Sequence, residues 1–111
     1  MKIAFVGKGG SGKSSISWLA VKTLEDINQH VLAIDADHNM DLTSNLGINP
    51  ENTPLMRTTE KEFMEKMSVC TDKNCTHNTL DKNHLPTFTI DDEYTKSITY
   101  PVSPNIDLIN I

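Results

Sequence analysis

The fold is decided by residues 5–15, "FVGKGGSGKSS", in which three glycines within four positions are followed by Lys13 and Ser14. From Gly7 to Ser14 the sequence matches G-x-x-x-x-G-K-[ST] at every fixed position. Such a loop turns its backbone N–H groups inward around phosphate oxygens, in conformations where a Cβ would clash. The pattern predicts a phosphate-binding loop made of Gly9, Gly10, Ser11, Gly12, Lys13, Ser14 and Ser15.

The residues that close the loop have distinct expected roles. Lys13 reaches the β- and γ-phosphates, and the N-terminus of the following helix adds a partial positive charge. The Ser14 hydroxyl is placed to ligate Mg²⁺. The alternative, a glycine-rich turn that only joins a strand to a helix, does not explain the full pattern. We therefore expect ATP and Mg²⁺ as ligands.

The loop is flanked by apolar segments with different periods. Lys2–Val6 is a short apolar run that predicts a buried strand. Lys13 to about Gln29 predicts an amphipathic helix packed on a sheet, and His30–Asp35 predicts a second buried strand. The apolar positions of that helix are Ile16, Leu19, Ala20, Leu24 and Ile27. Strand, helix and strand in succession predict an α/β fold with a parallel sheet and right-handed crossovers.

Two further helices are expected downstream. Met40–Gly47 predicts a short helix that ends at Gly47, because glycine permits the left-handed conformation common after a helix. Thr59 and Glu62 form a capping-box pattern that opens a modest helix.

The remaining segments predict a loop and an extended C-terminal region. Cys70–Pro86 is polar and is interpreted as a loop. Ser97–Val102 predicts a strand or extended segment, and Ile106–Ile111 predicts a final strand. A terminal apolar strand without a covering helix would leave a sheet face and one edge bare.

An acidic cluster follows the second predicted strand. Asp35 and Asp37 lie at its carboxyl end, where open α/β sheets bind ligands. The alternative is an ordinary acidic strand end that caps the next helix. For Asp35 we expect support of the strand end or of a water bound to the metal.

The second lysine of the loop, Lys8, indicates which family of phosphate-loop proteins the chain resembles. "KGGSGKS", which begins at Lys8, matches the deviant phosphate loop K-G-G-x-G-K-[ST], and "VLAIDAD" follows the helix. With these motifs the chain resembles the MinD/ParA superfamily of dimeric P-loop ATPases, most closely its CooC-type and nitrogenase iron protein-like branch. The resemblance implies a mostly parallel sheet with flanking helices, of which this chain holds an incomplete part.

The resemblance also implies roles for individual residues. Lys8 would cross a dimer interface to the partner's nucleotide, and a cation supplied in this way couples hydrolysis to association. Asp37 would orient or activate the attacking water, and Asp41 would lie near Mg²⁺. His38 departs from the proline common at that position. The implied catalytic residues are Lys8, Lys13 and Asp37, and the implied magnesium ligands are Ser14, Asp37 and Asp41.

The resemblance divides the chain into three parts. Residues 1–48 carry the phosphate loop and first switch, residues 49–102 a variable insertion, and residues 103–111 a further core strand. The family's second switch, D-x-x-x-G, has no match here. We therefore expect the 111 residues to be the phosphate-binding portion of a longer ATPase.

Composition limits the expected partners and compartment. Ten basic and 15 acidic residues give a net charge of −5, so no sequence-wide basic field attracts nucleic acid or anionic lipid. The length suits a single domain, and neither a leader nor a long apolar run is apparent, which predicts a cytoplasmic protein. The expected partners are ATP, a second copy of the chain, and a protein client such as a metalloenzyme or a division or partition machine.

Two other functions stay open at this point. Cys70, Cys75, His77 and His84 could close a zinc or nickel site in a metal-binding accessory module, although their spacing departs from the usual knuckle. A small P-loop kinase would need an arginine-bearing lid, and Arg57 is the only arginine.

Overall fold

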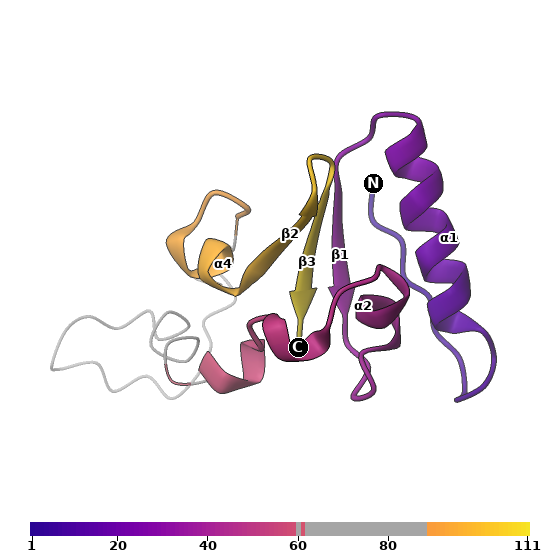
Figure 1. Cartoon of the computed structure of the whole chain (residues 1–111), viewed down its shortest axis with the longest axis horizontal. Helices are drawn as coiled ribbons and strands as arrows, with labels where there is room; N and C mark the ends of the chain where they lie inside the picture. Colours follow the sequence, from indigo (N-terminus) through magenta and orange to yellow (C-terminus); the bar gives the residue numbers. More distant parts are fainter. Residues whose placement is uncertain (60, 62–88) are drawn as a thin grey trace, which may run out of the picture.

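The computed structural model describes residues 1–59, 61 and 89–111 of the chain. It contains both helices and strands, as Figure 1 shows. The α-helices are α1 (Lys13–Asp26), α2 (Asp41–Asn45) and α4 (Glu93–Ile98), with the 3₁₀ turns η1 (Pro50–Asn52) and η2 (Met56–Thr59). The strands are β1 (Val31–Asp35), β2 (Thr99–Ser103) and β3 (Ile106–Asn110). The predicted α/β class is confirmed.

The three strands form one small mixed sheet in the order β1-β3-β2. β1 and β3 run parallel, with Ala33 opposite Leu108 and Asp35 opposite Asn110. β2 and β3 are antiparallel. The predicted final strand therefore lies in the centre of the sheet, so its edges are both paired, and the expectation of a bare edge there was wrong.

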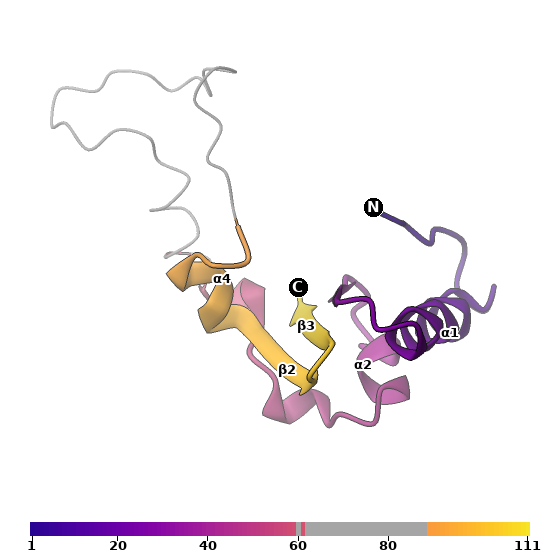
Figure 2. The ribbon, with the colours of Figure 1, turned by 90° about the horizontal axis from the view of Figure 1, so that it is seen from above.

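The core lies on one face of this sheet. Val21, Ala33, Leu42, Ile106 and Leu108 form a single buried cluster. Alternate residues of a strand point to the same face, so the residues at positions 106 and 108 of β3 and position 33 of β1 meet the helices together. Figure 2 shows α1 and α2 on the same side of β3, and the two helices contact each other as well as β1.

The predicted strand Lys2–Val6 is not formed. Residues 1–8 have no regular secondary structure and are all exposed, including Ile3, Phe5 and Val6. A strand needs a neighbour with which to share backbone hydrogen bonds, and residues 1–8 pair with no strand of this sheet. Both edges of β3 are occupied, whereas the outer edge of β1 has no partner strand within the described residues.

The helix α1 is confirmed and it contacts β1, but the predicted apolar stripe is not the face that packs on the sheet. It ends at Asp26 rather than near Gln29, and Asn28 adopts a left-handed φ of 58° just beyond it. Ile16 and Leu19 are 53% and 55% exposed, and Val21 is the buried residue of the helix. The expected sheet-facing stripe instead borders an open apolar groove of about 360 Å³, because no strand lies there to cover it. The residues lining the groove are Ile3, Ile16, Leu19, Ala20, Thr23 and Leu24.

The later predictions fared unevenly. A short helix before Gly47 is confirmed as α2, and Gly47 has a φ of +80°. An extended segment is confirmed as β2, which pairs with β3 although it falls in the range 49–102 assigned to a variable insertion.

One helix was not predicted, and two expected segments are outside the described residues. α4 has only six residues, "EYTKSI", three of which are poor helix formers, and it is held by the burial of Thr95 and Ile98. The helix expected after Thr59 and the loop Cys70–Pro86 lie largely or wholly outside the part that the structure describes. Among the described helices, none has the length and apolar character needed to cross a membrane.

Candidate phosphate-binding site

The glycine loop enters α1 with its backbone already turned. Gly10 and Gly12 have φ values of +78° and +85°, in the left-handed region that residues with a Cβ rarely adopt. Gly12 is the N-cap of α1, and no side chain caps the helix there. In the described part of the chain, the N–H groups of Gly10, Gly12 and Lys13 have no backbone acceptor. The loop therefore presents unpaired donors at the positive end of a 14-residue helix.

Three of the loop glycines are open and one is closely packed. A Cβ on Gly7 would lie 2.7 Å from the Ser11 Oγ, so the Ser11 side chain would have to shift. A Cβ on Gly9, Gly10 or Gly12 would meet nothing within 4 Å. The Cβ positions of these three glycines therefore face open space.

Lys13 closes the loop from the helix side. Its ammonium Nζ donates a hydrogen bond to the backbone carbonyl of Lys8, over 3.1 Å, and the N–H of Ser11 donates to the same carbonyl over 3.2 Å. A cation is thereby held against the loop. The Lys8 side chain is exposed, and no side-chain hydrogen bond or ion pair involving it is found among the described residues.

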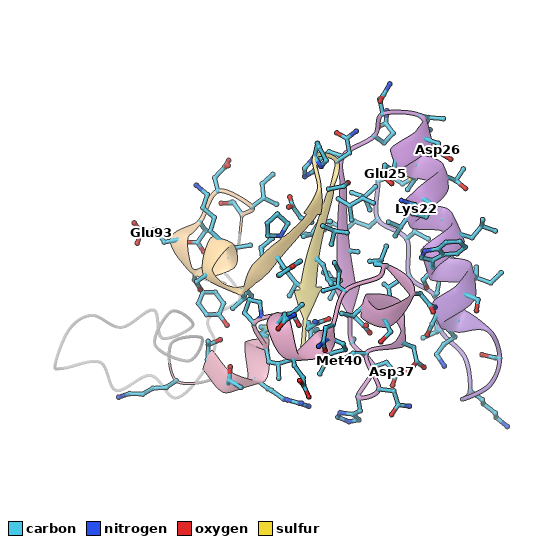
Figure 3. The ribbon with its side chains drawn as sticks, in the orientation of Figure 1. Lys22, Glu25, Asp26, Asp37, Met40 and Glu93 are labelled. Carbon is cyan, nitrogen blue, oxygen red and sulfur yellow. The ribbon has the colours of Figure 1, made fainter. Side chains whose placement is uncertain are left out.

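The acidic segment between β1 and α2 lies at the same end of the molecule. Figure 3 shows Asp37 and Met40 at the end where the glycine loop enters α1 in Figure 1. Asp37 is half-buried, and its Oδ1 accepts a weak hydrogen bond of 3.4 Å from the N–H of Asn39. Asp41 is exposed in the first turn of α2. The contact of α2 with α1 brings the two segments into one region.

A strained backbone residue holds this segment. Met40 has a φ of 50°, which is costly for a residue with a Cβ, yet its side chain is buried. Its N–H donates to the carbonyl of Asp37 over 3.1 Å, and its own carbonyl accepts from the N–H and the hydroxyl of Ser44. These bonds compensate the strain and keep the loop 37–40 turned.

Asp35 points into the protein, away from a ligand. Its side chain is 3% exposed. The carboxylate accepts hydrogen bonds from the N–H of Asp37 (3.2 Å) and from the N–H and hydroxyl of Thr43 (2.9 and 2.8 Å). This geometry agrees with support of the strand end, one of its two expected roles.

Sequence reasoning missed the residues that complete this support. Thr43, Asn110 and Thr53 form a buried polar chain with Asp35, and the four come from segments far apart in the sequence. The one available signal was Asn110, a polar residue at the end of the apolar run "NIDLIN".

The described residues can be checked for side chains that could bind Mg²⁺. No group of three or more His, Cys, Asp or Glu side chains that could hold a metal occurs among the described residues. Mg²⁺ bound with a nucleotide needs only one or two protein carboxylates, because phosphates and waters complete its shell. The carboxylate of Asp41 is exposed and the hydroxyl of Ser14 lies one residue into α1, so the oxygen ligands suit that kind of site.

The residues expected for the two alternative functions, a metal-binding module and a small kinase, lie outside the described part of the chain or apart from the glycine loop. Cys70, Cys75, His77 and His84 all lie outside the described residues. Arg57 is exposed in η2, apart from the glycine loop in the sequence and in Figure 1.

The sheet, the glycine loop and α1 are compatible with part of a P-loop NTPase domain that contains a small mixed sheet. The chain is 47% identical over 51 residues to the carbon monoxide dehydrogenase accessory protein CooC of Rhodospirillum rubrum. It is also 42% identical over 69 residues and 40% identical over 53 residues to two uncharacterized ATP-binding proteins of Methanocaldococcus jannaschii. These matches cover 46%, 60% and 48% of the chain.

The matched relatives are much longer than this chain. It spans 19%, 28% and 21% of their respective lengths. No family model matches the chain, and no solved structure matches it either. The partial matches confirm the resemblance to MinD/ParA-like P-loop NTPases and to ATP-binding proteins.

Proposed function

We propose that the chain binds Mg²⁺-ATP through Gly9–Ser15 and that, in a complete dimeric protein, ATP hydrolysis drives a change of conformation and association. The observation that carries the proposal is the glycine loop itself. Gly10 and Gly12 are already in left-handed conformations, and Lys13 is already held on the loop. A ligand with phosphate oxygens would meet these donors without a costly rearrangement.

Each polar residue has a proposed part in this cycle. Lys13 would move from the Lys8 carbonyl to the β- and γ-phosphates, and Ser14, Asp37 and Asp41 would hold Mg²⁺. Mg²⁺ when bound neutralises charge on the phosphates. Asp37 would accept a hydrogen bond from the attacking water.

Lys8 supports the dimer in this proposal. Its side chain is exposed and without a recorded partner in the described part of the chain, so it is available to a second subunit. A cation that enters the partner's site would stabilise charge that develops on the transferred phosphoryl group. CooC is by its name an accessory protein of carbon monoxide dehydrogenase, so a metalloenzyme is the client we propose to test first.

Calorimetry of ATP binding with and without Mg²⁺ tests the binding step. Lys13→Ala is expected to weaken ATP binding by about 100-fold, because a charge-assisted hydrogen-bond donor to the phosphates is lost. Lys22→Ala is the matched control: Lys22 lies on the same helix but donates to Glu25, well away from the loop in Figure 3. Equal affinities of the two variants would contradict the proposal.

The dimer step has its own measurement. Sedimentation with a non-hydrolysable ATP analogue should show association that Lys8→Ala abolishes, while ATP binding by that variant stays within about twofold of the unmodified chain. Loss of binding by Lys8→Ala would place Lys8 in its own subunit's site and overturn the role across the interface.

A further inference from the structure

A series of buried hydrogen bonds runs from Asp35 at the end of β1 to the turn 50–53. The Thr43 Oγ1 lies 2.8 Å from the Asp35 Oδ2 and 2.6 Å from the Asn110 Oδ1. The Asn110 Nδ2 lies 2.6 Å from the Thr53 Oγ1, which lies 2.8 Å from the Pro50 carbonyl oxygen. The four side chains are between 0% and 8% exposed, so no bulk water can substitute for a missing partner. The series links β1, α2, β3 and the turn 50–53.

The hydrogen atoms in this series of hydrogen bonds are too few for every one of its close contacts to be a hydrogen bond at the same time. The Thr43 hydroxyl carries one hydrogen, but it faces two acceptors, the Asp35 carboxylate and the Asn110 amide oxygen. If the Asn110 amide turns by 180°, its Nδ2 donates to Thr43, and Thr43 donates to Asp35. The Thr53 hydroxyl then donates to the Asn110 Oδ1, and the Pro50 carbonyl keeps the N–H of Thr53 as its donor. Amide oxygen and nitrogen occupy nearly the same positions, so both arrangements fit one set of atoms.

The two arrangements differ in what they give to Asp35. In the first, the Thr43 hydroxyl points to Asn110, and the carboxylate keeps only the N–H groups of Asp37 and Thr43. In the second, it also receives the Thr43 hydroxyl. A buried carboxylate is stabilised by each added donor, so the direction of the hydrogens determines how firmly Asp35 holds the start of the acidic loop and the first turn of α2.

We propose that Thr43 is a positioning residue for magnesium-dependent nucleotide binding, and that its hydroxyl couples the loop carrying Asp37 and Asp41 to the turn 50–53. The inference rests on the proposed function. Asp35 grips both ends of that loop, at the N–H of Asp37 and at Thr43. The Thr43 hydroxyl lies within hydrogen-bond distance of both Asp35 and Asn110. A ligand that draws Asp37 and Asp41 toward it would therefore favour one hydrogen-bond direction, and the turn 50–53 would respond.

A Mg²⁺ titration of ATP binding in the 111-residue chain tests this coupling. Thr43→Val has nearly the same shape but lacks the hydroxyl, and it is expected to raise the Mg²⁺ concentration for half-maximal ATP binding by about fivefold. ATP binding in a metal chelator should change by less than about twofold. Thr43→Ser keeps the hydroxyl and should restore the normal Mg²⁺ requirement. A role in stability alone would lower the melting temperature of Thr43→Val and leave that requirement unchanged, which would overturn the inference.

A second variant guards against loss of folding. Thr53→Val removes the hydroxyl at the far end of the chain of hydrogen bonds, and it should raise the Mg²⁺ requirement in the same direction by a smaller factor. Thr58→Val is the matched control, because the Thr58 hydroxyl bonds the Leu55 carbonyl at an exposed position. If Thr43→Val does not fold and Thr53→Val equals Thr58→Val, the coupling is disproved.

Backbone amide exchange supplies a readout other than binding. Addition of Mg²⁺ and ATP should slow exchange in residues 37–43 and also in residues 50–53 of the unmodified chain, and Thr53→Val should retain only the first effect. If the unmodified chain binds no ATP, the proposed function fails. If it binds ATP and all variants share one Mg²⁺ requirement, the inference alone fails.

Discussion

The first 26 residues and the β1-α2-β3 unit contain similar apolar residues but differ in how far these are exposed to solvent. In the first region several large apolar side chains remain in solvent, such as Leu19 at 55% and Val6 at 92% exposed, although Val21 of α1 is buried in the core. In the second, Leu108 is 1% exposed and Ile106 is fully buried. The glycine loop nevertheless has its turned backbone, because left-handed glycines and a helix start require only local geometry. The turned backbone of the glycine loop therefore does not depend on a completed sheet, whereas we expect the stability of the chain to depend on the β1-α2-β3 core.

The largest expected difference comes from shortening one leucine in each region. Leu108→Ala should lower the free energy of unfolding by about 2–5 kcal/mol, because it removes buried methyl groups and leaves a cavity. Leu19→Ala should change it by less than about 0.5 kcal/mol, because that side chain lies in an open groove. Urea denaturation followed by circular dichroism measures both. Similar losses of unfolding free energy for the two variants would mean that the Leu19 side chain is covered by another part of the protein.

A pair of glycines tests the local nature of the loop. Gly12→Ala should destabilise the start of α1 by about 1 kcal/mol, because alanine is strained at a φ of +85°. Gly9→Ala should leave stability unchanged, since its new Cβ would meet no atom within 4 Å and its φ is not in the left-handed region. The same titration with ATP sharpens the test: an affinity loss in Gly9→Ala without a stability loss would place the ligand against that Cβ. A stability loss in Gly9→Ala would contradict the open loop.

The smallest expected effect concerns the contact between α1 in the first region and the edge strand β2, which pairs with β3 of the second. The Glu25 carboxylate of α1 accepts hydrogen bonds from the Lys22 ammonium and from the Ser103 hydroxyl at the end of β2, and these bonds hold its pKa below its usual value. A lowered pKa in the folded state adds stability above the pKa of the unfolded chain, and that stability is lost as the pH falls through the folded pKa. Glu25 is exposed to solvent screening, so the effect should be small.

The variant Glu25→Gln should therefore be slightly less stable than the unmodified chain at neutral pH and equally stable in acid. Thermal melts from about pH 2 to about pH 7, roughly the range in which carboxylates titrate, would measure this difference. Ser103→Ala should remove part of the same difference. A gap that widens on acidification would have the wrong sign and would exclude this contact as its cause.

Much of the second region was predictable from periodicity. The apolar runs of β1 and β3 and the short helix before Gly47 are each close to their predicted positions, as is α1 in the first region. These patterns report local preferences that the tertiary structure reinforces. The six-residue α4 has no such period, and its buried Thr95 and Ile98 hold it instead.

The failures share one physical cause. Lys2–Val6 has the composition of a strand, but a strand exists only when a neighbour accepts its hydrogen bonds. The apolar stripe of α1 has the correct spacing, but which surface covers it is not a property of the helix. At the candidate site, Asp35 appeared as one of several acids near a ligand, and its contact with Thr43 shows that it faces the interior.

By itself, the sequence determined the features that arise from preferences within a few residues: the glycine loop, the start of α1, the end of α2 just before Gly47 and the apolar runs of β1 and β3. Only the tertiary structure decided which strand is central, which apolar side chains are buried, and that Asp35, Thr43, Asn110 and Thr53 meet. Those outcomes depend on pairing and packing between segments up to 75 positions apart, from Asp35 to Asn110, and no local preference encodes which partner a segment will find.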